Sequence, residues 1–315
     1  MTSTAKNLSG DDLDDPTCLY VGLMKERVAE KAEETQQLVD RFRVHMEVDP
    51  DSEKIRFSAQ SSTGKIIIGL KGAARLMGHS YAYVSTHYRL VVWLQSLMGS
   101  KPEKLSGGDW SRSASQILAW AVTGDIRGKL KDYERDFIPE HIPDDILKLV
   151  DSCLPPKQQD IAGEIYANAI VWILYHELTH IQMGHKECEG LESLEQERQA
   201  DRLAAEWMLD AEGIDPVVLH KRQLGIATAL GWLTATTAFL GPGSRTTHPA
   251  AYDRLYQTLE QYIPREHEDV WLYVQVMLVL HLLLAGLTFD EDRIGPPFKE
   301  NANYLIDVIA NTGNK

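Results

Sequence analysis

Residues 170–185 have the sequence IVWILYHELTHIQMGH, and the expected architecture follows from this segment. Its first residues are apolar on every side, which is typical of a helix buried in the interior. His176 and His180 are four residues apart, so both imidazoles lie on one face of that helix, one turn apart. Neutral imidazoles at this spacing suit a shared zinc ion. The segment therefore predicts a helical protein with a metal on its central helix.

Glu177 follows His176 directly, so its side chain is poorly placed to bind the same ion. It can instead reach a water bound to the metal, take its proton and later pass it to a leaving amine. Two histidines and a glutamate on an apolar helix without partners would be costly to bury. The HExxH pattern therefore indicates a zinc peptidase site, and we interpret Glu177 as its general base.

A catalytic zinc site needs a third protein ligand. Glu197 and Asp201 lie four residues apart, on one face of the next expected helix. Glu192 and Glu195 are rivals, but each has only an amide four residues later. His185 lies five residues after His180 and should point well round the helix, so we expect a surface histidine there.

An HExxH helix followed by a helix bearing ExxxD resembles the gluzincin metallopeptidases. The resemblance implies that Glu197 is the third zinc ligand. It also implies that Asp201 hydrogen-bonds His176, fixing the tautomer and orientation of that ring. The sixteen residues between His180 and Glu197 suffice for a helix end, a turn and the start of a returning helix.

A third segment, TTHPAAYDRL at 246–255, looks like the THPxxxxR segment of gluzincins of the CAAX-prenyl-protease type. His248 precedes an expected helix start at Pro249 and could stabilise the oxyanion of the tetrahedral intermediate. It could equally be a helix N-cap residue packed beside the site. Tyr252 is another candidate donor.

The arrangement as a whole is similar to the Lit-type phage-exclusion peptidases, with specific motifs over residues 176–255. These relatives are cytoplasmic bacterial proteases that cleave a host translation elongation factor in response to phage. The resemblance therefore implies a cytoplasmic location, a protein or peptide substrate, and a translation factor as target by analogy alone. The sequence makes no prediction of oligomeric state.

Composition excludes other classes of function. The net charge of -14 argues against binding to nucleic acid or to anionic lipid. The three cysteines, Cys18, Cys153 and Cys188, are far apart and odd in number, which favours thiols in a reducing cytosol. The apolar segments 224–240 and 271–287 are near the short limit for spanning a membrane, and we expect core helices there.

The expected fold is mainly α with a small N-terminal antiparallel β meander, an α+β chain with a gluzincin-like helical core. We expect a helix over 19–42, strands over 44–48, 55–59 and 65–70, and helices after residue 71. The expected division is an acidic flexible tail (1–18), a helix and β-meander subdomain (19–71), and a helical metallopeptidase domain (72–315) with its active site at 176–255.

The sequence thus predicts a zinc endopeptidase with one zinc ion per chain. An alternative is a non-proteolytic, zinc-stabilised sensing or interaction module on the same scaffold. Glu177 argues against the alternative, because a structural zinc site has no use for a general base.

Overall fold

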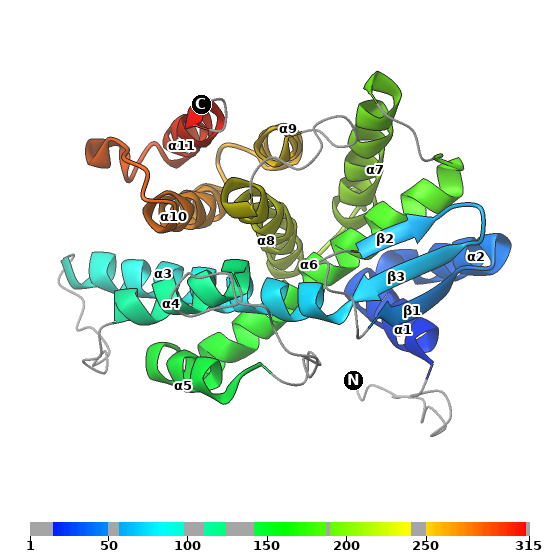
Figure 1. The fold of residues 1–315 in the computed structure, drawn as a ribbon, viewed down its shortest axis with the longest axis horizontal. Coiled ribbons are helices and arrows are strands. Elements are labelled where there is room, and N and C mark those ends of the chain that lie inside the picture. The colour runs from blue at the N-terminus through cyan, green and yellow to red at the C-terminus, as the bar shows by residue number, and fades with distance from the viewer. Residues whose placement is uncertain are drawn as a thin grey trace.

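The computed structural model describes residues 15–49, 57–97, 110–123, 142–186, 190–240 and 250–312, which form a mainly helical protein with one small sheet (Figure 1). The N-terminal elements are α1 (Pro16–Arg27), the 3-10 helix η2 (Ala29–Lys31), α2 (Ala32–Phe42), β1 (His45–Asp49), β2 (Phe57–Gln60) and β3 (Lys65–Gly69). The later elements are α3 (Leu70–Leu97), α4 (Trp110–Thr123), α5 (Asp144–Cys153), α6 (Pro156–Met183), α7 (Leu191–Leu209), α8 (Pro216–Leu240), α9 (Ala251–Tyr262), α10 (Glu268–Leu284), η3 (Glu291–Arg293) and α11 (Phe298–Thr312). The expected class, mainly α with a small β part, is confirmed.

The three strands pair in the order β1-β3-β2, which corrects the expected antiparallel meander. β3 runs parallel to β1 and antiparallel to β2, with Ile66 opposite both Met46 and Ala59. The physical reason is the composition of the strands. Ile66 and Ile68 are fully buried, so β3 takes the central position, where both of its edges are paired.

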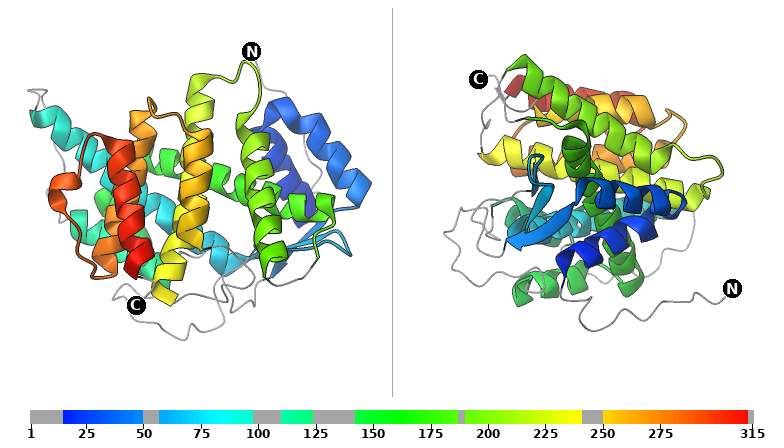
Figure 2. Two further views of the ribbon diagram at one scale, coloured as in Figure 1. Left: turned by 90° about the horizontal axis from the view of Figure 1, so that it is seen from above. Right: turned by 90° about the vertical axis from the view of Figure 1, so that its right-hand side faces the viewer.

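Helix α6 lies at the centre of the protein and contacts α1, α3, α7, α8 and β2. Ile170, Val171 and Leu174 are at most 1% exposed, so the expected buried helix is confirmed. A Cβ at Gly225 of α8 would lie 2.5 Å from the Cβ of Asn168, so glycine is needed for this close approach of the two helices. Figure 2 shows the helices of the C-terminal half standing side by side on one side of the molecule.

The single helix expected over 19–42 is divided into α1 and α2. Arg222, on α8, donates hydrogen bonds from Nε and Nη2 to the backbone carbonyl of Arg27, at 3.0 and 2.6 Å, and its guanidinium also pairs with Glu30. The carbonyl at the end of α1 therefore has a partner supplied by a residue 195 positions away. Helical periodicity in the N-terminal segment does not reveal such a partner.

The two apolar segments form parts of α8 and α10, as expected for core helices. Leu230, Met277 and Leu278 are fully buried, and Trp271 is 1% exposed. Within the described residues, no helix is both long and apolar enough to span a membrane. The last helix, α11, packs against α10 and α9 at the C-terminal end.

Some expectations fall outside the described residues. These are residues 1–14 of the acidic tail and Cys188. Cys18 is exposed, Cys153 is buried, and neither of these two is in a disulfide. The division into tail, subdomain and metallopeptidase domain stays a prediction.

Candidate metal centre

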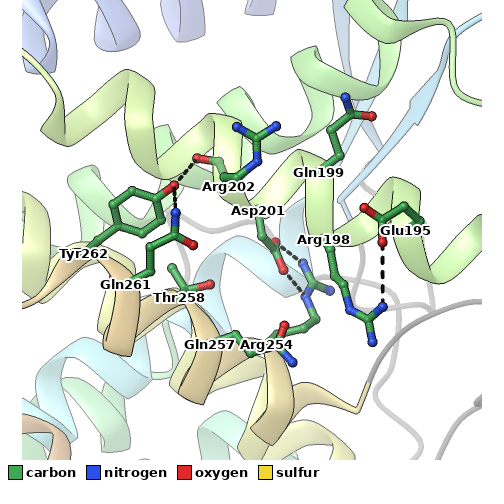
Figure 3. A pocket seen from close by; sticks show the side chains of 10 residues that line it. All are labelled: Glu195, Arg198, Gln199, Asp201, Arg202, Arg254, Gln257, Thr258, Gln261 and Tyr262. Atoms are coloured by element: carbon green, nitrogen blue, oxygen red, sulfur yellow. Dashed lines mark hydrogen bonds and ion pairs between the residues drawn. The ribbon is translucent and has the colours of Figure 1, made fainter.

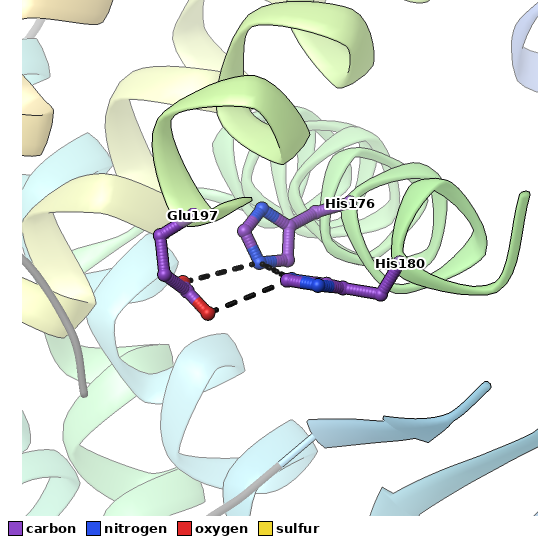
Figure 4. A group of neighbouring side chains, drawn as sticks. All are labelled: His176, His180 and Glu197. Carbon is purple, nitrogen blue, oxygen red and sulfur yellow. Dashed lines mark hydrogen bonds and ion pairs between the residues drawn. The ribbon is translucent and has the colours of Figure 1, made fainter. Parts of the chain in front are cut away.

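Three side chains from two helices meet at one point, as Figure 4 shows. His176 and His180 come from α6, Glu197 comes from α7, and one potential ligand atom of each lies within 4.8 Å of the others. Glu197 Oε2 is 3.5 Å from His176 Nε2, and Oε1 is 3.5 Å from His180 Nε2. The two Nε2 atoms are 3.1 Å apart. Two imidazole nitrogens and a carboxylate facing one another form a donor set that suits a divalent metal ion.

Glu177 lies beside the cluster and is only 8% exposed. Burial is the main influence on its carboxyl group and raises the pKa, while His176 and the backbone N–H of Ala59 act in the opposite direction. Ala59 belongs to β2, so the small sheet contacts the site directly. Ser61, in the turn that follows β2, donates a hydrogen bond from Oγ to the backbone carbonyl of His180 at 3.0 Å.

Behind His176 lies a buried ion pair, shown in Figure 3. Asp201 Oδ1 is 2.9 Å from His176 Nδ1. Arg254, from α9, donates to both oxygens of Asp201, from Nε to Oδ2 at 2.7 Å and from Nη2 to Oδ1 at 2.6 Å. Its third nitrogen, Nη1, lies 3.3 Å from Glu197 Oε2. One guanidinium therefore contacts both acidic residues of the ExxxD pattern.

The charges around the cluster favour a divalent cation. Glu177, Glu197 and Asp201 are buried carboxylates, and Arg254 is the cation that the described structure places among them. With the carboxylates ionised, two negative charges remain uncompensated, and an isolated buried charge is costly. A metal ion with two positive charges would neutralise the group.

The pKa values of the two histidines diverge in the protein without metal. Burial alone lowers the pKa of His176, but Asp201 and Glu197 outweigh it and raise the value to about 10. Burial is also the main influence on His180, and together with the charge of His176 it lowers the pKa to about 3. A single proton, held on His176, thus partly replaces the positive charge of a metal.

His185 was expected at the surface, and the structure corrects this. Its Nδ1 lies 2.9 Å from Nδ1 of His180, and its Nε2 lies 3.0 Å from Oε1 of Gln199 on α7. His185 is therefore half-buried against the back of His180, and it is not a member of the ligand cluster.

The other candidates fall in different places. Glu192 and Glu195 are exposed on α7, away from the cluster that contains Glu197. Tyr252 packs against the hydrophobic core, and residues two apart on a helix do not face the same way, so it points away from Arg254. His248 lies outside the described residues. Sequence reasoning missed the contacts of Arg254, although the THPxxxxR segment contained the residue.

A sequence profile of the family described as Peptidase U49 matches residues 111–274, a little over half of the chain. The chain belongs to the peptidase U49 family. The matched region includes α6, α7 and α9, which carries Arg254, and so the whole cluster described above.

The cell death peptidase of Escherichia coli (strain K12) is 29% identical over 211 residues, which cover 67% of this chain and 67% of that protein. With the family match, this relative confirms the resemblance to Lit-type peptidases. No solved structure matches the chain. Membership of a peptidase family makes the chain a peptidase, whose substrate is a protein or peptide.

Proposed function

We propose that this U49 peptidase is a zinc-dependent endopeptidase that cleaves a cytoplasmic protein, as a conditional protease of the Lit type. The observation that carries the proposal is the cluster of His176, His180 and Glu197 with the buried Glu177 beside it. Zinc is the metal that this donor set suits, because it binds imidazole and carboxylate ligands and needs only three from the protein in a catalytic site.

The roles of the surrounding residues follow from their contacts. A zinc ion held by the three ligands would supply Lewis acidity, which makes water a stronger acid and polarises a peptide carbonyl. Glu177 would take the proton of the attacking water and deliver it to the departing amine. Burial raises the pKa of its carboxyl group, which favours the brief retention of that proton. Asp201 would orient His176, and Arg254 would hold Asp201 and Glu197 in place.

The sheet supports an extended substrate. Within the described sheet β2 is an edge strand, and Ala59 directs its backbone N–H toward Glu177 on α6. A peptide lying along this edge would place its backbone next to the general base, and pairing to a strand edge needs no particular side chains. We therefore infer that the substrate presents an extended segment. A translation factor as target rests on the analogy with Lit-type proteases alone.

The test compares wild-type protein with Glu177→Gln in two measurements, metal content and a proteome-wide cleavage profile. We expect Glu177→Gln to retain about one zinc ion per chain and the wild-type melting temperature. Cleavage should fall by roughly 100- to 10,000-fold, because the attacking water loses its proton acceptor.

Glu192→Gln, at an exposed position on α7, is the matched control and should cleave normally. The double variant His176→Ala/His180→Ala should lose tight zinc binding. Near-normal cleavage by Glu177→Gln would rule out the mechanism, and stoichiometric zinc in the double variant would place the metal elsewhere.

A further inference from the structure

The end of helix α6 turns His185 back beneath His180. Gly184 adopts the left-handed conformation, with φ of 64°, which a residue with a side chain rarely adopts. The backbone N–H of Gly184 donates to Ile181 and that of His185 donates to His180, at 3.1 and 3.0 Å. These two bonds form a Schellman motif. The motif reverses the chain, so the ring of His185 stacks edge-on against that of His180, with centroids 4.9 Å apart.

The hydrogen bonds then define where each proton lies if His180 binds a metal. Its Nε2 faces Glu197 and His176, so Nε2 is the ligand atom and the proton of the neutral ring is on Nδ1. That N–H must donate to Nδ1 of His185, 2.9 Å away. His185 consequently carries its own proton on Nε2, which donates to Oε1 of Gln199 at 3.0 Å. Each N–H donor in this series of hydrogen bonds, from His180 through His185 to Gln199, has an acceptor, and no proton is left over.

We propose that His185 and Gln199 are positioning residues that fix the tautomer and ring orientation of His180. The inference rests on the proposed function, since it requires His180 to be a zinc ligand. The pair would do for His180 what Asp201 does for His176, but without adding a charge. A second carboxylate in that place would add a negative charge to a centre whose buried charges a divalent ion already balances.

The arrangement also explains why His185 is not a ligand itself. Its ring contacts the Nδ1 side of His180, whereas Glu197 contacts the Nε2 side. Gln199 lies on α7, the helix that also carries Glu197 and Asp201. The two hydrogen bonds therefore tie the last turn of α6 to the helix that supplies the third ligand.

The experiment measures zinc affinity of the full-length protein by chelator competition for two variants that lose the hydrogen bonds. His185→Phe keeps a ring and removes both nitrogens, and Gln199→Leu removes the acceptor. Each should weaken zinc binding roughly 10- to 100-fold, with little change in the melting temperature of the metal-free protein. Gln199→Glu retains an acceptor oxygen and should bind zinc at least as tightly as wild type. Gln182→Ala, exposed on the last turn of α6, is the control.

Nitrogen-15 NMR of the zinc-loaded wild type provides a second readout that packing alone would not determine. We expect the proton on Nδ1 of His180 and on Nε2 of His185. Three results would each overturn the proposed positioning role of His185 and Gln199. They are unchanged zinc affinity in His185→Phe, a proton on Nδ1 of His185, or a loss of zinc affinity in Gln199→Glu as large as that in Gln199→Leu. If the wild type cleaves protein and binds zinc, and these variants bind zinc with the same affinity, only the positioning role fails. If the wild type binds no zinc, the proposed function fails and the positioning role fails with it.

Discussion

Arg254 donates two hydrogen bonds to Asp201, one to each carboxylate oxygen, although 53 residues separate them in the chain. Both side chains are less than a tenth exposed. The same Asp201 oxygen that accepts from Nη2 lies 2.9 Å from His176. A planar guanidinium matches a carboxylate in this two-point geometry. The ion pair therefore holds Asp201 in the position from which we propose that it orients His176.

Replacing Arg254 should weaken the metal site. Arg254→Lys keeps the charge but loses the planar two-point hydrogen bond to Asp201, so we expect zinc affinity to fall roughly 10- to 100-fold. Asp201→Asn, which weakens the same contact, should lower zinc affinity by a similar factor. Arg254→Met leaves a buried carboxylate unpaired and should also reduce the free energy of unfolding by about 3–5 kcal/mol. Chelator competition and urea unfolding measure the two effects. Arg202→Lys, 45% exposed and paired with Glu206, is the control. Normal zinc affinity in Arg254→Lys would show that the two-point hydrogen bond between Arg254 and Asp201 has no role in metal binding.

Zinc binding should release a proton. The pKa of His176 is raised to about 10 without metal, mainly because Asp201 and Glu197 outweigh the effect of burial. The ring is therefore protonated at pH 8 and must lose its proton to bind the ion. We expect release of about one proton per zinc ion, and an affinity that rises about tenfold per pH unit, below about pH 7. His180, with its pKa lowered to about 3, contributes none.

Titration calorimetry in buffers of different ionisation enthalpy measures this release. The experiment is best done in Glu177→Gln, because the buried carboxyl of Glu177 could otherwise exchange a proton as well. Uptake of zinc without proton release would mean that His176 is neutral before the metal arrives.

The sequence leaves two roles open for His248, and the variant His248→Ala tests them. Arg254 lies in the first turn of α9 and reaches the cluster, so the start of this helix is next to the site. If His248 is an oxyanion donor, His248→Ala should lower kcat much more than it raises KM and leave zinc content unchanged. α9 begins at Ala251 with Ala250 as its N-cap, not at Pro249 as expected, so the helix-cap role of His248 is excluded. If His248 has another structural role, the melting temperature of His248→Ala should fall and the kinetic loss should be modest. Tyr252→Phe is the matched control, and normal behaviour of His248→Ala in both assays would exclude both roles.

The ligand cluster could be predicted because local geometry defines it. His176 with His180, and Glu197 with Asp201, are each four residues apart, and helix periodicity alone places each pair on one face. The resemblance to gluzincins then suggested that the two helices meet. The contacts of Arg254 could not be predicted in this way, because they depend on how α9 packs against α7.

Other errors have equally specific causes. The three strands were located to within about two residues by their β-branched content, but nothing in their order along the chain shows that β3 takes the central position. His185 was placed at the surface because helix periodicity was extended past Gly184, where the chain reverses. A glycine at a helix end is a signal for such a reversal and could have indicated it.

The buried histidine His79 should make the protein sensitive to acid. It lies on α3 with no exposed surface, and its Nδ1 donates to the backbone carbonyl of Arg75 at 2.8 Å. Its Nε2 has no hydrogen-bond partner within the part of the chain that the structure describes. Burial lowers the pKa to about 4, from 6.5 in an exposed histidine. Below pH 6.5 His79 therefore binds a proton in the unfolded chain, whereas in the folded protein it stays neutral until the pH approaches 4.

The sign of the effect follows from this difference. The contribution of His79 to stability is complete above pH 6.5 and is lost as the pH falls toward 4, by about 1.4 kcal/mol per pH unit. The free energy of unfolding, measured with urea between pH 6.5 and 5, should therefore depend less steeply on pH in His79→Phe than in wild type. The slope should be smaller by about that amount. An equal slope in His79→Phe and wild type would mean that His79 takes up its proton in the folded protein as readily as in the unfolded chain.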